Sequence, residues 1–297
     1  MSVCVIGSLN LDIVCRVAEL PAPGETVAGL GVERLPGGKG GNQAVAAARA
    51  GAHTVMVAAV GQDEAGEIML ASLKDAGVDA ARVVALPNHP TGQAFIWVSA
   101  AGENSIVVAG GANAFLTPDR ASDLAGHAVI LGQLETPVAT LEAAFARAGG
   151  ARRILNAAPA LEAGRALLPL TDILIVNETE LARYARSAAV PESEADIAAA
   201  ARTLIGRDDQ TVIVTLGKAG ALAVSRSDVH RVAGRPARVV DTTGAGDCFC
   251  GVLAARLSEG APLAEAMAWA NAAAGLSTQK PGAAPSMPTR GEIEAAL

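Results

Sequence analysis

Short runs of consecutive apolar residues recur along the chain, each ending in glycine or a polar residue. They lie at residues 3–6, 54–60, 129–131, 173–176 and 211–215. Runs of this kind are typical of strands buried on both faces, as in a parallel sheet. Alanine-rich stretches between them favour helices; two of these end at Gly51 and Gly77. The alternation predicts an α/β fold with a Rossmann-like three-layer arrangement, in which helices flank a central, mostly parallel sheet.

Consecutive strand-like segments interrupt the alternation. Residues 91–99 and 104–109 are predicted to form a hairpin, and segments near residues 12–35 have a similar character. We therefore expect a small second sheet, a candidate lid built from segments near 12–35 and 91–109. No internal repeat or low-complexity segment divides the chain, so residues 1–297 are expected to form a single domain.

Composition excludes several classes of protein. The 297 residues are 51% hydrophobic but only 2% aromatic, so the core must be built from Ala, Val, Leu and Ile. A formal net charge of -7 argues against nucleic-acid binding, which usually needs a basic face. Cys4, Cys15, Cys248 and Cys250 form no C-x-x-C pair and are expected to be reduced thiols. With neither a signal peptide nor a membrane-spanning stretch in the sequence, we expect a cytoplasmic protein without membrane contact.

Polar residues follow the apolar runs. Asn10 and Asp12 share one face of the alternating segment 8–14, and Glu135 follows the run at 129–131. The later runs lead into the pair Asn177 and Glu180 and into Thr215-Leu216-Gly217. Because the carboxyl ends of parallel strands meet at one edge of a sheet, these residues are expected to share a cleft. For segment 8–14, a solvated edge strand is the alternative.

Two glycine-rich stretches stand out. Gly37-Gly38-Lys39-Gly40-Gly41 precedes an alanine-rich helix; it is no Walker loop, because Gly40 follows Lys39, and a flexible hinge is the alternative to a ligand-binding loop. Asp241-Thr242-Thr243-Gly244-Ala245-Gly246-Asp247 lies between an expected short strand at 238–240 and an expected helix at 248–257. A glycine turn at a helix start favours an anion site. Asp247 is predicted to be either the helix N-cap or a catalytic carboxylate.

These two stretches resemble the signature motifs of the ribokinase-like (PfkB) sugar kinases, and the similarity extends over essentially the whole chain. It includes Gly7-Ser8-Leu9-Asn10-Leu11-Asp12, Gly110-Gly111-Ala112-Asn113 and Asn177-Glu178-Thr179-Glu180. The resemblance implies a ribokinase-like fold and ATP-dependent phosphorylation of a sugar. It is strongest to members that phosphorylate the O5 hydroxyl of D-ribose. Another pentose, a ketohexose derivative or a nucleoside stays open as substrate, and so does a sugar-binding protein without turnover, which the intact Asp247 disfavours.

The resemblance also implies a role for each matching residue. Asp247 would be the catalytic base, and Gly244, Ala245 and Gly246 would form the anion hole. The sugar would be held by Asn10, Asp12, Gly38, Lys39, Gly40, Gly41, Asn42, Glu135 and Asp247. ATP would be contacted by Asn177, Thr215, Leu216, Gly217, Lys218, Ala219, Gly220, Gly246 and Asn271, with Glu180 organising Mg²⁺ through its waters. A monovalent cation, K⁺, would be surrounded by Asp241, Thr243, Ser277, Lys280, Gly282 and Ser286.

General chemistry agrees with these roles. Phosphoryl transfer needs mainly positioning and charge stabilisation, which a glycine turn and a helix start supply. The carboxylates and amides of Asp12, Asn42 and Glu135 suit a polyol. Phe95 and Trp97 on the lid are expected to pack within it or at a dimer contact. The resemblance implies a homodimer formed through the lid, and strand edges there would need cover.

Overall fold

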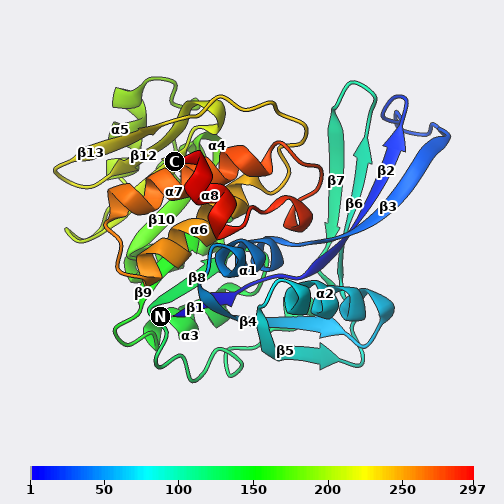
Figure 1. Cartoon of the computed structure of the whole chain (residues 1–297), viewed down its shortest axis with the longest axis horizontal. Coiled ribbons are helices and arrows are strands. Elements are labelled where there is room, and N and C mark those ends of the chain that lie inside the picture. Colours follow the sequence, from blue (N-terminus) through cyan, green and yellow to red (C-terminus); the bar gives the residue numbers. More distant parts are fainter. Residues whose placement is uncertain (1) are drawn as a thin grey trace.

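The computed structural model describes residues 2–297, which form two β-sheets and the helices around them (Figure 1). The large sheet has nine strands in the order β13-β12-β11-β10-β9-β8-β1-β4-β5. All neighbours from β5 to β11 are parallel, whereas β12 and β13 continue antiparallel. The strands are β1 Ser2–Ile6, β4 His53–Gly61, β5 Asp79–Leu86, β8 Val129–Gln133, β9 Arg152–Asn156, β10 Ile173–Asn177, β11 Thr211–Thr215, β12 Gly220–Val224 and β13 Val229–Ala233.

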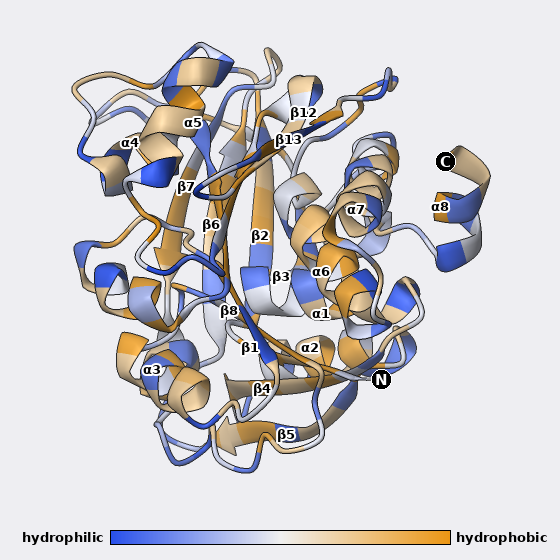
Figure 2. Ribbon diagram, turned by 90° about the vertical axis from the view of Figure 1, so that its left-hand side faces the viewer, coloured by the Kyte–Doolittle hydropathy of each residue, from blue (hydrophilic) through white to orange (hydrophobic). Residues whose placement is uncertain are grey.

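Helices cover both faces of this sheet and enclose two separate apolar clusters. One face carries α1 Lys39–Arg49, α2 Glu64–Asp75, α6 Ala245–Ser258, α7 Leu263–Ser277 and α8 Arg290–Ala296. The other carries α3 Val138–Ala146, α4 Glu178–Ala185 and α5 Glu194–Arg202, with the 3₁₀ segments η1 Gly111–Phe115 and η2 Glu162–Leu170. Residues of α1, α6 and α7 belong to the apolar cluster on this face, and Figure 2 shows α6 mostly in hydrophobic colours.

The apolar runs are explained by this double burial. Along β1, Val3 and Val5 enter one cluster while Cys4 and Ile6 enter the other, and all four side chains are fully buried. Side chains alternate between the faces of a strand, so a strand covered on both faces has to be apolar throughout. The predicted three-layer α/β fold is therefore confirmed.

The small sheet has the order β3-β2-β6-β7 and stands beside the large one (Figure 1). It consists of β2 Asn10–Val17, β3 Gly29–Gly37, β6 Gly92–Val98 and β7 Asn104–Ala109, which confirms the predicted lid-like sheet and its hairpin. The chain crosses between the two sheets four times, after β1, β3, β5 and β7. The segments next to these crossings lie at the carboxyl end of the large sheet, where the polar residues gather.

The expected strand at residues 238–240 was wrong. The backbone N–H groups of Val240 and Asp241 both donate to the Thr278 carbonyl, at 2.7 and 3.1 Å, instead of joining a sheet. The side chains of Val239 and Val240 are 60% and 59% exposed. The β-branched residues favour extended backbone, but the sheet already ends at β13.

The hinge interpretation of the first glycine stretch was also wrong. Helix α1 begins at Lys39, so Gly40 and Gly41 belong to its first turn and are buried. A Cβ atom on Gly40 would lie 2.5 Å from the backbone nitrogen of Ser8. The glycines therefore allow close contact between α1 and the chain that leaves β1.

The cysteines are free thiols, as expected, and burial raises the pKa of Cys4 and Cys248 to about 12. Across residues 2–297, none of the helices combines the length and the apolar character that crossing a bilayer requires.

Candidate active site

Charged side chains from four elements converge at the carboxyl end of the large sheet. Asp12 lies on β2, Lys39 begins α1, Glu135 follows β8, and Asp247 lies in the first turn of α6. Burial, together with the charges of Glu135 and Asp247, raises the pKa of Asp12 to about 7. The Asp247 carboxylate raises the pKa of Lys39 against the effect of burial, and Glu135 adds to this. The predicted cleft therefore brings residues distant in sequence together.

Asp247 is buried in the first turn of α6 and is not its N-cap. The N-cap of α6 is Gly244, which has no side chain, so the N-cap interpretation of Asp247 was wrong. The Asp247 side chain is only 8% exposed. Its Oδ2 accepts a hydrogen bond from Asn42 Nδ2 and its Oδ1 accepts one from Gln43 Nε2, both at 2.9 Å. A buried carboxylate with one amide donor on each oxygen is well suited to take a proton from a ligand beside it.

The glycine turn before α6 has the conformation that an anion site needs. Gly244 has a φ of 76°, in the left-handed region, and a Cβ atom there would lie 2.7 Å from the Cβ of Ala283. The Ala245 N–H donates to the Thr242 carbonyl at 3.2 Å. Gly246 lies in the first helical turn, where backbone N–H groups lack intrahelical acceptors, and the space beside its Cα is open. The turn thus presents the Gly246 N–H at the positive end of the helix dipole, whereas the N–H of Ala245, also predicted to form the anion hole, is already hydrogen-bonded.

The expected sugar-binding residues lie together on the lid side of Asp247. Glu135 Oε2 accepts hydrogen bonds from Ser8 Oγ at 2.5 Å and from the Lys39 N–H at 3.2 Å. Asn10 is buried, and its Oδ1 accepts from Asn113 Nδ2 at 2.8 Å. Gly38 has a φ of 83°, and a Cβ atom there would lie 2.7 Å from the Asn10 nitrogen. The chains that leave β1 and β3 are thereby fixed side by side.

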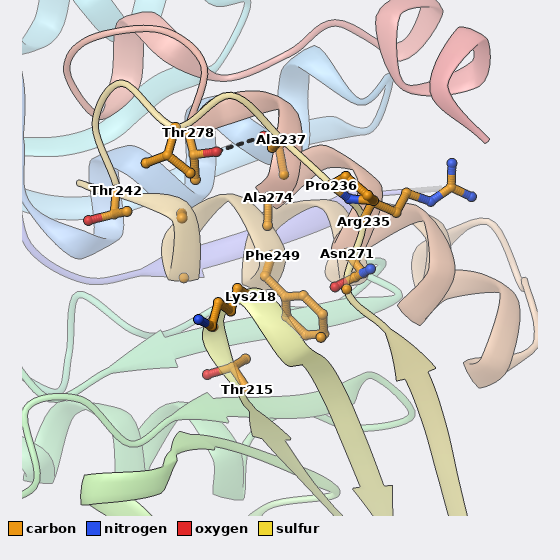
Figure 3. A pocket seen from close by; sticks show the side chains of 17 residues that line it. Thr215, Lys218, Arg235, Pro236, Ala237, Thr242, Phe249, Asn271, Ala274 and Thr278 are labelled. Atoms are coloured by element: carbon orange, nitrogen blue, oxygen red, sulfur yellow. Dashed lines mark hydrogen bonds between the residues drawn. The ribbon is translucent and has the colours of Figure 1, made fainter.

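A cavity of about 660 Å³ opens beside the start of α6 (Figure 3). Thr215 and Lys218 lie on one side of it and Thr242 and Thr278 on the other, with Phe249 between. Of the residues predicted to contact ATP, the cavity is lined by Thr215, Gly217, Lys218, Gly220, Gly246 and Asn271. Leu216, Ala219 and Asn177 are outside its lining. Asn271 Nδ2 donates to the Ala233 carbonyl at 2.9 Å, so its amide is anchored to β13.

Asn177 and Glu180 form a capping box at the start of α4. Asn177 Oδ1 accepts from the Glu180 N–H at 2.8 Å, and Glu180 Oε2 accepts from the Asn177 N–H at 2.9 Å. Burial raises the pKa of Glu180, and the charge of Asp247 adds to this. The side chains of Asn177 and Glu180 are therefore fixed by the capping hydrogen bonds of α4, and the charge of Asp247 acts on Glu180.

Of the residues expected around a monovalent cation, Asp241, Thr243 and Gly282 are joined to one another by hydrogen bonds. Asp241 accepts hydrogen bonds from the N–H groups of Thr243 and Gly282, both at 2.9 Å. Although burial opposes it, these bonds hold the pKa of Asp241 below its usual range. The hydroxyls of Ser277 and Ser286 donate to nearby carbonyls, and Lys280 Nζ pairs with Glu292 at 2.8 Å.

Comparison with known proteins identifies the family. A family model described as pfkB family carbohydrate kinase matches residues 1–290. The chain belongs to this family. It is 37% identical to the ribokinase of Haemophilus influenzae, covering 97% of this chain and 95% of the relative. It is 39% identical to the bifunctional ribokinase/ribose-5-phosphate isomerase A of Fructilactobacillus sanfranciscensis, covering 98% of this chain but 55% of that protein's length.

A solved structure of Arabidopsis thaliana ribokinase complexed with ribose and ATP has the same fold, with a TM-score of 0.92 and 32% identity. The alignment covers 99% of this chain and 98% of that chain. The chain is thus a phosphotransferase of the carbohydrate kinase class that uses ATP, with a ribokinase-like fold.

In this sugar kinase the sequence reasoning missed several residues at the site. Phe249 and Ala274 line the cavity, and Ser8 and Asn113 hold the sugar-side residues. Ser8 and Asn113 lie within motifs that carried the resemblance, which was a usable signal. Phe249 and Ala274 lie in apolar helices, where nothing distinguishes a cavity residue from a core residue.

Proposed function

We propose that this chain is an ATP-dependent ribokinase, which phosphorylates the O5 hydroxyl of D-ribose to give D-ribose 5-phosphate and ADP. The observation that carries the proposal is the position of Asp247. This buried carboxylate lies in the first turn of α6, where Ala245, Gly246 and Phe249 of the same helix line a cavity of about 660 Å³. It is also hydrogen-bonded to Asn42, one of the proposed sugar-binding residues. The family membership and the ribokinases among the relatives support the choice of reaction and substrate.

In the proposed reaction Asp247 accepts the proton of the O5 hydroxyl as O5 bonds to the γ-phosphorus of ATP. The bond from that phosphorus to the β,γ-bridging oxygen breaks, and ADP leaves. The Gly246 N–H and the dipole of α6 stabilise charge on the transferred group. The Lys39 ammonium interacts electrostatically with the carboxylates of Asp247 and Glu135. It would add positive charge near the transferred phosphoryl group. Most of the rate enhancement then comes from positioning and electrostatics, as expected for phosphoryl transfer.

The sugar would be held by Asn10, Asp12, Asn42 and Glu135 and by the backbone of Gly38, Lys39, Gly40 and Gly41. Asn42 Oδ1 is buried without a hydrogen-bond partner among residues 2–297, which fits an acceptor for a sugar hydroxyl. ATP would occupy the cavity lined by Thr215, Gly217 and Asn271. We place the sugar and the nucleotide on opposite sides of Asp247.

Two cations complete the proposal. Mg²⁺ would neutralise charge on the phosphates, and the carboxylate of Glu180, the kind of oxygen ligand that Mg²⁺ prefers, would organise it through water. K⁺ would be held by Asp241 and by backbone carbonyls around Thr243, Ser277, Lys280, Gly282 and Ser286. The hydroxyls of Ser277 and Ser286 already donate to the carbonyls of Ala274 and Ala283. Backbone carbonyls are therefore the favoured K⁺ ligands at these two residues. This cation would steady the turn that carries the anion site.

A substrate panel tests the assignment. D-Ribose, 2-deoxy-D-ribose, other pentoses, ketohexose derivatives and nucleosides are compared by kcat/KM in an assay of ADP release with Mg²⁺ and K⁺. D-Ribose should give the highest value, and Asp247→Asn should lower kcat by orders of magnitude while ATP binding persists. Saturable sugar binding without ADP release would establish a binding protein instead, and a higher kcat/KM for another compound would reassign the substrate.

We also propose that residues 1–297 work as one kinase domain and that two copies associate through their lids. The lid sheet ends in two exposed strands, β3 and β7. On β3, Leu30 and Val32 are 70% and 63% exposed, and Ile106, Val107 and Val108 of β7 are 50–56% exposed. Apolar side chains on an open sheet edge need a partner. Light scattering should give a dimer mass that Val107→Lys reduces, and a monomeric parent protein would refute this arrangement.

A further inference from the structure

Three buried amide side chains are linked to Asp247 by hydrogen bonds. Gln43, on α1, is fully buried, as is Gln133 at the end of β8. Asn156, at the end of β9, is 9% exposed. Burying a glutamine or asparagine side chain is costly unless its amide groups are hydrogen-bonded, so their partners indicate what each one does.

Gln133 and Gln43 form a directed chain of amides that ends on the carboxylate, and Asn156 accepts a second hydrogen bond from Gln43. Gln133 Nε2 donates to Gln43 Oε1 at 2.6 Å. Gln43 Nε2 in turn donates to Asp247 Oδ1 at 2.9 Å and to Asn156 Oδ1 at 3.0 Å. Because Gln43 Oε1 accepts from Gln133, its NH₂ group faces Asp247 and cannot turn away without breaking all three bonds. A carboxylate oxygen is a hydrogen-bond acceptor, so this orientation gives Asp247 Oδ1 a fixed donor.

This chain of amide side chains lies in the interior of the protein. Gln133 Oε1 lies over Gly7, where a Cβ atom would be 1.9 Å away, so the glycine after β1 makes room for it. The same oxygen has no hydrogen-bond partner among residues 2–297. Keeping an unpaired buried oxygen costs stability. A leucine of similar size would avoid that cost, so the amide must contribute something other than stability.

We infer that Gln43, oriented by Gln133, is a positioning residue that fixes the rotation of the Asp247 carboxylate. This inference rests on the proposed role of Asp247 as the base. With Gln43 on Oδ1 and Asn42 on Oδ2, the plane of the carboxylate is set from both sides. The remaining lone pairs are then directed toward the sugar hydroxyl in advance. The arrangement follows the general rule that a catalytic base is itself oriented by a further group.

The test compares Gln43→Leu, Gln133→Leu and the double variant with the parent protein in steady-state kinetics. Gln43→Leu should lower kcat about 10- to 100-fold, because a misdirected base loses alignment with its proton, while KM for ATP stays within about twofold. Gln133→Leu should give a smaller loss of the same kind. If Gln133 acts through Gln43, the double variant should be no slower than Gln43→Leu alone.

The split between kcat and KM separates positioning from a general structural effect. A misdirected base slows the chemical step, so kcat should fall while KM for D-ribose and for ATP stays within about twofold of the parent value. A general disturbance of the site would instead raise KM together with the loss in kcat.

Gln210→Leu is the matched control. Gln210 is another buried glutamine, 5% exposed, which donates to the carbonyls of Leu168 and Thr171 away from the site. It should lose stability while kcat and KM stay within about twofold of the parent values. If Gln43→Leu does not fold, Gln133→Leu carries the test under the same two criteria.

Two outcomes overturn the inference: a kcat within about twofold of the parent in both single variants, or a fall in kcat accompanied by an equal or larger rise in KM. A parent protein that phosphorylates a sugar other than D-ribose changes only the substrate used in the test. An Asp247→Asn variant that retains turnover removes the base assignment and the inference with it. Failure of the positioning role is thus distinguishable from failure of the proposed function.

Discussion

Asp12→Asn should make the unliganded protein more stable at pH 8 while it weakens sugar binding. Burial and the neighbouring charges of Glu135 and Asp247 raise the pKa of Asp12 from 3.8 to about 7. The ionised carboxylate is therefore disfavoured in the folded state relative to the unfolded chain. Asparagine has nearly the same shape without the charge, so it removes this penalty.

The magnitude follows from proton linkage. A folded-state pKa of about 7 against 3.8 corresponds to roughly 4 kcal/mol. The folded state binds the proton more tightly, so the penalty is absent below pH 3.8, grows as the pH rises, and is complete above pH 7. Because Asp12 keeps some contact with solvent, we expect about 2–4 kcal/mol of stabilisation at pH 8, falling to about 1–2 kcal/mol at pH 5.

Urea unfolding at both pH values measures this difference. Asp75→Asn is the matched control, because Asp75 is an exposed carboxylate at the end of α2 and its loss changes the net charge equally. Sugar binding should show the opposite trend, with KM for D-ribose raised about 10-fold or more, since hydrogen bonds to a charged acceptor are lost. An Asp12→Asn effect that is equal at pH 5 and pH 8, or destabilising at pH 8, would refute the reasoning.

Three further substitutions test separate features. Gly244→Ala should lower kcat at least about 100-fold, since the methyl group would meet Ala283 at 2.7 Å in a left-handed backbone; wild-type kinetics would contradict the anion-site geometry. Trp269→Ala should lower the free energy of unfolding by about 3–5 kcal/mol. The Arg256 guanidinium lies 4.2 Å from the ring centroid, so this contact is lost together with the ring. Calorimetry measures the loss of stability, and KM for ATP should stay unchanged. Asp241→Asn should abolish the activation of turnover by K⁺ over Na⁺, and preserved selectivity would move the cation site elsewhere.

Much of the cleft was predictable because a parallel sheet fixes where its strand ends lie. Asp12, Glu135 and Asp247 are far apart in sequence, yet each follows an apolar run or begins a helix, and the topology brings them together. The capping box of Asn177 and Glu180 also has a recognisable sequence pattern, N-x-x-E after an apolar run. Local sequence patterns therefore identified residues whose positions depend on strand ends and helix starts.

The amide chain could not be predicted in the same way. Gln43 follows the glycine stretch on an alanine-rich helix, where a polar side chain usually marks the solvent face. Only the packing of α1 against α6 reveals that Gln43 faces inward. The strand predicted at Val239 and Val240 failed for the opposite reason. These residues favoured an extended backbone locally, but no free strand edge was within reach. In both cases the decisive contact is made by an element far away in sequence.

The order of the segments along the chain has a consequence for biosynthesis. The lid and the proposed sugar-binding residues all come from the first 135 residues, whereas α6 and α7 come from residues 245–277. These late helices cover the same face of β1 and β4 as α1 does. A nascent chain that has emerged as far as β9 therefore carries a lid and half of a cleft over an uncovered apolar face. Emergence of one late segment, residues 245–277, then closes the core and delivers the base, so that catalytic competence and protection from aggregation are acquired together.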